Sequence, residues 1–511
     1  MYGKVINMTE KKILEQIKML IDEGKLKDAG SFIEGLSDKE RSPRVLCELA
    51  GVYNDLSVSE DPDNADTDLL LRSVAILKDI EDLLPENDHL LNYRLGQALI
   101  CLDRAGEGWE RLDRALIERP DDEDTKEIMS KYFGRLTLPL YKKSFKQRIR
   151  DGWAKFAAGE SKLRRLISEK AESDAITGLC SELLADAFCD PCFEVGFNGE
   201  KYDLILSPEK DKLMLFLYEE FKKRAPESVL EHWNILLGRQ QVVSENFALG
   251  FHGKQIAPTE ITVRTERGDN GFKIIGYCEQ LAPLLPGQRG EALWFFDILL
   301  DMAIGEVVSM RYVDAIDLEA KPFEGIPLPE LPKEMEKLFG EKEGWDSAES
   351  YLENYSGYEM KPREFAEDEY PTPRFDSFFC VSALPQLVID YLEGDHYSIN
   401  KADNDGVAAG FIFFPAYVFE DDENAKRGEK ILNFRDELER YIEEKAGDSF
   451  AFVGGASGVN NCYLDFLAWD LRDVLDAAAE FFANQSIVPW AFYQSYRSDV
   501  SIVGLMRNEE D

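Results

Sequence analysis

Apolar residues recur at helical spacing over the first quarter of the chain. Between residues 10 and 135, Leu, Ile and Ala return every three to four positions among Glu and Lys, the period of an amphipathic helix. The clearest unit runs from Leu90 to Pro120, with Gly96 on a first helix, Gly108 on a second and proline at its end. Residues 1–136 are therefore predicted to form paired helices.

Weaker copies of this unit precede it, over Ile13–Leu36 and from Leu46 onward. The offsets resemble the tetratricopeptide pattern, in which small residues lie where two helices touch and a proline ends the second helix. About three repeats would be near the minimum for a stable array. A non-repetitive helical bundle is the alternative.

The resemblance implies a peptide-binding groove, because the inner helices of tetratricopeptide proteins line one. Some members clamp a C-terminal carboxylate there with Lys and Asn, which this chain lacks at the matching places, so we expect a different ligand. Plain helix surface is the alternative for each residue. The groove positions carried over from the family are Arg44, Cys47, Gly51, Asn54, Leu90, Tyr93, Gln97 and Ile100.

A basic helical bridge is predicted over residues 137–190. Between Lys142 and Lys170 ten residues are basic and three are acidic, so the segment is either a docking surface for an acidic partner or a helix that packs on the acidic body of its own chain. An apolar face at helical spacing is formed by Phe145, Ile149, Trp153 and Phe156.

The period changes to two after Phe193, which predicts strands. Asn198-Gly199 lies between two alternating runs, the strongest short signal for a β-hairpin. We expect residues 191–335 to form an α+β domain with an antiparallel sheet, and residues 336–404 to be a linker with a helical segment. The expected elements are strands at 193–197, 202–206, 232–237, 259–266 and 272–279, and helices from Ser207 and over 293–304.

Residues 405–511 carry the order β-α-β-β-α-β, which is the ferredoxin-like arrangement. The elements are strand 410–419, helix 424–445, strands 450–453 and 462–469, a helix after Asp470, and strand 488–496. The predicted fold class is therefore α+β multidomain: an all-α, tetratricopeptide-like N-terminal part, then antiparallel-sheet α+β domains, the last of them ferredoxin-like. Proteins with such folds have many different functions, so the fold class does not predict the function of this chain.

A possible pocket surrounds the run Gly454-Gly455-Ala456-Ser457-Gly458, together with Asn460 and Asn461. A phosphate-binding P-loop would need a Lys-Ser/Thr pair opening a helix after the glycines. Here a second strand follows, so we expect a wide hairpin whose glycines take positive φ. If the chain is an enzyme, its candidate residues are Cys189, Cys192, Ser457, Asn460, Asn461 and Asp465.

The CxxC pair Cys189–Cys192 lies after a helix and before a strand, the reverse of a thioredoxin-like motif, and is expected to be a structural corner. Neither Asp61–Asp66 nor Asp403–Gly406 matches the EF-hand loop, and both are expected to be acidic turns. No catalytic residue, metal or cofactor is therefore expected.

The net charge of the chain limits the classes of molecule that we expect it to bind. The chain contains 99 Asp and Glu residues and 59 Lys and Arg residues, which gives a net charge of −40. Such a surface repels phosphates, so nucleic acid and anionic membranes are not expected partners. The start of the chain has no apolar leader segment, and eight scattered cysteines are typical of a reducing compartment. A cytoplasmic protein is expected.

Several stretches outside the helical repeats resemble a group of tetratricopeptide-containing proteins of gut Firmicutes, whose function is unknown. They are Phe193–Pro208, Glu231–Asn234, Gly454–Gly458 and Tyr463–Phe466. The resemblance implies a bacterial cytoplasm and adds no catalytic residue. We expect a non-catalytic adaptor that binds a protein or peptide, with a basic partner among the options. The alternatives are an acidic immunity-type protein that binds a basic toxin, and an enzyme or ligand sensor with a cleft in the α+β domains.

Overall fold

A computed structural model describes residues 9–58, 65–242, 248–268, 271–339, 344–363, 372–419 and 424–506. The chain is an α+β multidomain protein with helices first and several small sheets after them. It forms two compact units. The first comprises residues 1–145, 359–380 and 386–511, and the second residues 146–358 and 381–385. This division is coarser than the five segments expected from the sequence, which stay a prediction.

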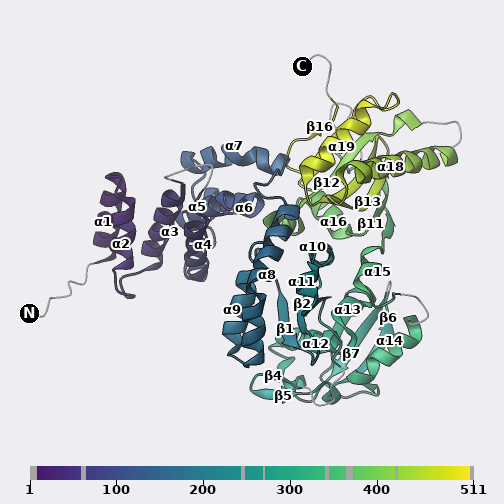
Figure 1. Ribbon diagram of the computed structural model, residues 1–511, viewed down its shortest axis with the longest axis horizontal. Coiled ribbons are helices and arrows are strands. Elements are labelled where there is room, and N and C mark those ends of the chain that lie inside the picture. Colours follow the sequence, from purple (N-terminus) through teal and green to yellow (C-terminus); the bar gives the residue numbers. More distant parts are fainter. Residues whose placement is uncertain are drawn as a thin grey trace, which may run out of the picture. The chain divides into compact units, whose positions relative to one another are not determined.

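The first unit begins with consecutive helices, coloured purple to blue in Figure 1. Neighbouring helices share apolar cores: Ile13, Ile33 and Val45 pack together, and Leu77 and Leu95 lie in the next cluster. The helices are α1 (Glu10–Asp22), α2 (Leu26–Glu34), α3 (Pro43–Val58), α4 (Thr67–Asp79), α5 (His89–Cys101), α6 (Ala105–Glu118) and α7 (Glu123–Thr137).

Gly96 on α5 and Gly108 on α6 let these two helices approach closely. A Cβ atom at Gly96 would come within 2.8 Å of the carbonyl oxygen of Gly108, and a Cβ atom at Gly108 would come within 2.7 Å of Ile100 Cγ1. Real Cβ atoms do not reach such distances without displacing a neighbour. The expectation that these small residues lie where two helices touch is confirmed.

The helical region also packs against later parts of the same unit. The Gly106 N–H on α6 donates to Asp403 Oδ2 (2.8 Å), and the Tyr141 hydroxyl donates to Asp403 Oδ1 (2.8 Å). Asp403 lies in α17 (Tyr397–Asn404) and is only 4% exposed. The expected acidic turn at 403–406 is thus partly a buried helix end, while most of the turn at 61–66 lies outside the described residues.

The C-terminal part of this unit follows the element order expected for residues 405–498. Strand β12 pairs antiparallel with β14 and β15, and β13 pairs antiparallel with β14. Within this unit the sheet has the order β11-β13-β14-β12-β15-β16. Its strands and helices are β11 (Ser377–Ser382), α16 (Pro385–Glu393), β12 (Ala408–Pro415), α18 (Asn424–Ala446), β13 (Phe450–Gly458), β14 (Asn461–Ala468), α19 (Leu471–Ala483), β15 (Phe492–Ser495) and β16 (Val503–Gly504).

Both faces of this sheet are covered near its centre, which explains the uninterrupted apolar run in the sequence. Every residue of β12 is buried. On one face Phe414 contacts Phe434 of α18 (ring centroids 5.0 Å apart), and on the other Phe411 contacts Tyr391 of α16 (5.4 Å). A strand buried on both sides loses the polar–apolar alternation of a half-exposed strand.

The second unit holds the basic bridge from Lys146 onward and the middle α+β region (Figure 1). Two of its strand pairs are parallel, β2 with β3 and β7 with β8, so the expectation of an antiparallel sheet is corrected. Helices connect these pairs, and a parallel pair needs such a crossover. The elements are α8 (Phe145–Ser168), α9 (Ser173–Leu184), β1 (Phe193–Phe197), β2 (Tyr202–Leu206), α10 (Lys212–Lys223), α11 (Glu227–Leu230), β3 (Trp233–Leu237), β4 (Leu249–Phe251), β5 (Lys254–Ile256), β6 (Thr262–Arg267), β7 (Phe272–Tyr277), α12 (Arg289–Ile304), α13 (Glu306–Tyr312), β8 (Val313–Leu318), β9 (Ile326–Pro327), α14 (Leu331–Phe339) and α15 (Ala348–Leu352).

The apolar face expected on the basic bridge is buried, and Trp153 stacks on Phe221 of α10 with ring centroids 4.1 Å apart. Some of its cations pair within the unit: Arg164 with Glu160, and Lys155 with Asp186 at 3.2 Å. For these two residues, the structure favours internal compensation over a docking surface.

Candidate functional site

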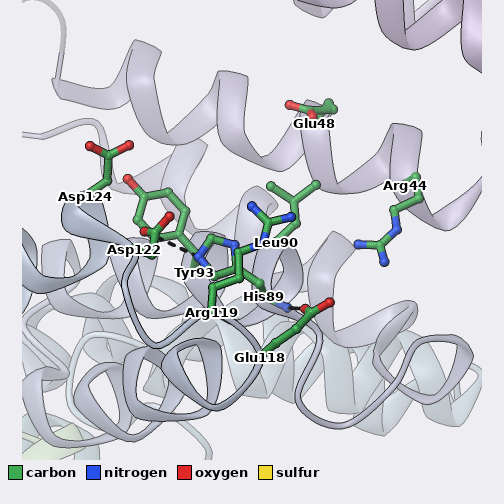
Figure 2. Close-up of a pocket in the computed structure, with 9 residues that line it drawn as sticks. All are labelled: Arg44, Glu48, His89, Leu90, Tyr93, Glu118, Arg119, Asp122 and Asp124. Atoms are coloured by element: carbon green, nitrogen blue, oxygen red, sulfur yellow. Dashed lines mark hydrogen bonds and ion pairs between the residues drawn. The ribbon is translucent and has the colours of Figure 1, made fainter.

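A pocket of about 430 Å³ opens at one end of the N-terminal helices (Figure 2). Helix α3 contributes Arg44 and Glu48, and the first turns of α5 contribute His89, Leu90 and Tyr93. The end of α6 and the start of α7 complete the wall with Glu118, Arg119, Asp122 and Asp124. Three residues expected in the groove, Arg44, Leu90 and Tyr93, therefore lie together on this wall.

The helix ends at the pocket are capped by carboxylates of the protein itself. Asp88 precedes α5 and accepts from the Leu91 N–H (3.0 Å), while Asp122 precedes α7 and accepts from the Thr125 N–H (3.0 Å). Glu118 Oε2 accepts from the His89 N–H at 2.5 Å. Unpaired N–H groups at a helix start commonly bind anions; here the protein's own carboxylates occupy these three.

Arg44 forms an ion pair with Asp88, the residue that precedes α5. Its guanidinium forms a two-point ion pair with Asp88, with one contact of 2.7 Å from Nη1 to Oδ1. The Asp88 side chain is 1% exposed, and its hydrogen bond raises the pKa of Arg44. Arg44 therefore does not present an unpaired positive charge to a ligand carboxylate.

His89 forms the inner wall of the pocket. Its side chain is 7% exposed, and its ring stacks on Tyr93 with centroids 5.8 Å apart and planes within 6°. Nε2 lies 3.3 Å from Asp122 Oδ2. Hydrogen bonds from Thr125, followed by the interaction with His89, lower the pKa of Asp122. Nδ1 of His89 is buried and has no hydrogen-bond partner among the residues that the structure describes.

Carboxylates outnumber cations around the pocket. The lining contains Glu48, Glu118, Asp122 and Asp124 against Arg44 and Arg119. Within the described parts of the chain, neither Glu48 nor Asp124 has an ion pair or hydrogen bond, and Figure 2 shows Asp124 beside the hydroxyl end of Tyr93. Because Arg44 is already paired with Asp88, the remaining lining is strongly negative.

This arrangement suits binding better than nucleophilic catalysis. A His–Asp pair activates a nucleophile only when a hydroxyl or thiol lies within reach. The Thr125 hydroxyl lies 3.5 Å from His89 Nε2, but Thr125 is fully buried and donates to Asp122 Oδ2 (2.7 Å). The described lining residues include neither Ser nor Cys.

The other expected groove residues do not line the pocket. Asn54 is 1% exposed and donates to the Arg94 carbonyl oxygen (2.8 Å) and, more weakly, to Gln97 Oε1 (3.4 Å). Ile100 is buried with Leu112. These residues lie where α3 meets α5 and where α5 meets α6. Cys47 and Gly51 are likewise buried: burial raises the pKa of Cys47 to about 12, and Gly51 faces the Arg94 guanidinium.

No specific signal in the sequence indicated the remaining wall residues, which are Glu48, His89, Glu118, Arg119, Asp122 and Asp124. Four of them lie at or beyond the end of α6, where the family resemblance implies no groove position. Asp88 and Asp122 were detectable as helix N-caps, since each precedes a helical period. Their position beside a cavity depends on the packing of three helices.

The glycine-rich stretch is part of strand β13 rather than the expected hairpin loop. After a bulge between Phe452 and Gly454, strand pairing continues from Gly454 to Ser457, and among the glycines of this stretch only Gly454 has positive φ (147°). A Cβ atom at Gly455 would overlap the Arg435 guanidinium, and one at Gly458 would come within 2.5 Å of Asp376 Oδ2. These two glycines make room for neighbouring side chains.

The turn after β13 is occupied by the protein's own carboxylate. The N–H groups of Asn460 and Asn461 donate to Asp376 Oδ2 at 2.8 and 3.0 Å. Ser457 lies on the strand opposite Cys462, and Asp465 is fully buried in an ion pair with Arg374. These contacts indicate that the polar groups of this stretch have a structural role.

Cys189 is exposed and Cys192 is partly buried, and all eight cysteines are free. Burial, followed by a hydrogen bond to Glu209, raises the pKa of Cys192 to about 12, which opposes thiolate formation. In the described part of the chain no group of three or more His, Cys, Asp or Glu residues is arranged to hold a metal ion. None of the described helices is both long and apolar enough to span a bilayer.

Comparisons with protein-family models, with curated proteins and with solved structures found no match to this chain. Its function therefore has to be inferred from the geometry of the chain itself.

Proposed function

We propose that this protein is a non-catalytic adaptor that binds a peptide segment of a partner protein at the pocket between α3, α5 and the start of α7. The observation that carries the proposal is this pocket of about 430 Å³, whose wall holds Arg44, Leu90 and Tyr93. An aromatic and an aliphatic side chain beside polar groups is typical of ligand-binding surfaces in proteins.

The helical region is proposed to be tetratricopeptide-like, with α1/α2, α3/α4 and α5/α6 as three repeats and α7 as a closing helix. The close approach of α5 and α6 at Gly96 and Gly108 supports this assignment. The C-terminal part is proposed to be ferredoxin-like, since the order β13-β14-β12-β15 with antiparallel neighbours fits that topology. Membership of the Firmicutes group and a bacterial cytoplasmic location belong to the same proposal.

The proposed partner is a protein with a basic surface, rather than nucleic acid or a membrane. A net charge of −40 favours encounters with positively charged proteins and disfavours phosphate-rich ones. An immunity-type protein that neutralises a basic toxin would use the same charge complementarity. The enzyme or sensor alternative has weaker support, because neither His89 nor Cys192 has the surroundings of a catalytic group.

Peptide selection on the full-length chain tests the proposal. Random dodecapeptides displayed on phage are selected against the wild-type protein, and synthetic copies of the enriched sequences are measured by fluorescence anisotropy. We expect one peptide family whose affinity drops about tenfold in Leu90→Ala, because a buried aliphatic contact contributes about 1–2 kcal/mol.

Leu71→Ala is the matched control, since Leu71 is an exposed leucine on α4 (51% exposed) and does not line the pocket. Its affinity for the same peptides should equal that of the wild type. Peptides that bind the wild type and Leu90→Ala equally well, or the absence of any enriched family, would refute the proposal.

A further inference from the structure

We infer that the pocket is a subsite for one basic side chain, the lysine or arginine of a bound peptide. The inference rests on the proposed peptide-binding function and adds the chemical class of the residue that is recognised. Its basis is the charge left over in the pocket, the backbone N–H groups that are already used by the protein's own carboxylates, and one buried ring nitrogen with no partner among the described residues.

The charge argument starts from the pairs that already exist. Arg44 is held by Asp88 beneath α5, so its charge is compensated before a ligand arrives. Four carboxylates and Arg119 remain on the wall. An ammonium or guanidinium group that enters this space gains Coulomb energy from Asp124 and Glu48, which have no ion pair within the described residues.

An anionic group finds few donors here. The N–H groups of His89, Leu91 and Thr125, at the starts of α5 and α7, each donate to a carboxylate of the protein. Such N–H groups are what a phosphate or carboxylate would use at a helix start. Apart from the Arg119 guanidinium, a C-terminal carboxylate would meet carboxylates rather than donors, so the charge of the site favours a cation.

His89 supplies the acceptor. Thr125 and His89 lower the pKa of Asp122, which keeps this carboxylate ionised. An ionised partner 3.3 Å from Nε2 keeps a proton on Nε2. When the ring is neutral, Nδ1 bears a lone pair; it is buried and has no partner among the described residues. An N–H of a basic side chain would satisfy it, whereas an aliphatic or carboxylate side chain would not.

Arg119 is the second cation of the pocket wall. It is exposed, sits among the acidic wall residues, and forms no ion pair within the described residues. Its guanidinium offsets part of the negative field and repels an incoming cation. Removing it should therefore tighten the binding of a basic ligand, an effect in the opposite direction to that of removing a wall carboxylate.

Saturation-transfer NMR on the full-length protein measures the binding of small probes directly. The probes are N-acetyl-lysine methylamide and N-acetyl-arginine methylamide. Their neutral counterparts are the Nε-acetyl-lysine and citrulline derivatives, and N-acetyl-glutamate methylamide is the anionic control. We expect at least one cationic probe to bind, and the neutral and anionic probes to bind more weakly or not at all.

Three single variants sharpen the test. Asp124→Asn should weaken cation binding about two- to fivefold, the effect of one exposed ion pair. Glu123→Gln removes the same charge from the same first turn of α7 without altering the described lining, and should have a smaller effect. Arg119→Gln should strengthen binding about two- to fivefold. If Arg119→Gln weakened probe binding more than Asp124→Asn did, the pocket would be an anion site instead.

Two further results would overturn the inference on their own. One is equal binding of the cationic and neutral probes; the other is an equal loss in Asp124→Asn and Glu123→Gln. If selected peptides depend on Leu90 but contain no basic residue, the subsite inference fails while the adaptor proposal stands. If the cationic probe binds as expected but no peptide is ever selected, the subsite stands and the adaptor proposal fails.

Discussion

At the scale of single residues, a fully buried ion pair lies in the C-terminal part of the first unit. Arg374 is 1% exposed and its Nη1 lies 2.6 Å from Oδ1 of Asp465, which is fully buried on β14. The guanidinium also lies over the rings of Phe411, Tyr463 and Tyr496, at 5.5, 5.2 and 6.0 Å from their centroids. Removing one partner would leave an uncompensated charge in an apolar setting.

We therefore expect Arg374→Met to lower the free energy of unfolding by about 3–5 kcal/mol, and the double variant with Asp465→Leu to recover a large part of that loss. Chemical denaturation followed by circular dichroism measures both. Lys445→Ala breaks an exposed ion pair with Glu480 and should leave the free energy of unfolding nearly unchanged. A single and a double variant of equal stability would contradict this account of the pair.

Glu439 on α18 should make stability depend on pH. Burial, followed by the charges of Glu443 and Asp436, raises the pKa of Glu439 from 4.5 to about 7. A carboxyl pKa that is higher in the folded than in the unfolded chain means that folding favours the protonated form. Stability contributed by this group is therefore lost as pH rises from about 4.5 through about 7.

Glu439→Gln should accordingly stabilise the protein by about 1 kcal/mol at about pH 8, a value reduced for solvent screening of a partly exposed side chain. Near pH 4.5 the substitution should change little, because Glu439 is already protonated there. Thermal unfolding at both pH values is the measurement. Glu437→Gln, on the exposed side of the same helical turn, is the control, and an equal gain from it would argue against the burial of Glu439 as the cause.

At the scale of elements, the contact between α5 and α6 depends on two small residues. Gly108→Leu would force the two helices apart, because even a Cβ atom at this position comes too close to Ile100 and Gly96. We expect a loss of about 2–3 kcal/mol, the range for overpacked sites. In Gly134→Ala, on α7, the new Cβ atom meets no neighbour within 4 Å, so the higher helix propensity of Ala should add about 0.5–1 kcal/mol. Equal effects at both sites would contradict the close contact.

Local signals predicted some elements closely. The strands on either side of Asn198-Gly199 have the expected bounds, 193–197 and 202–206, because both the alternation and the turn chemistry are encoded within a few residues. The run Gly454–Gly458 has equally strong local glycine chemistry but was misassigned. Its glycines accommodate Arg435 and Asp376, residues distant in sequence, and a local pattern does not report such neighbours.

At the scale of the whole molecule, the net charge of −40 affects the stability of the folded state. Like charges repel across the surface, and this repulsion opposes the compact state. Raising NaCl from about 10 mM to about 150 mM shortens the screening length from about 30 Å to about 8 Å. We expect the melting temperature to rise by a few degrees, with KCl acting like NaCl at equal ionic strength. A fall would mean that screened ion pairs outweigh the screened repulsion.

The sequence by itself determined the order of helices and strands, the apolar faces that become buried, and the acidity of the surface, because each of these depends on residue types at short spacing. Only the tertiary structure decided that β2 and β3 pair in parallel and that Asp403 contacts the start of α6. It also decided that Asn54 and Ile100 are buried, while His89 and Asp122 line a cavity. These features depend on which distant segments meet, and that choice follows from packing whole apolar faces against one another rather than from any local pattern.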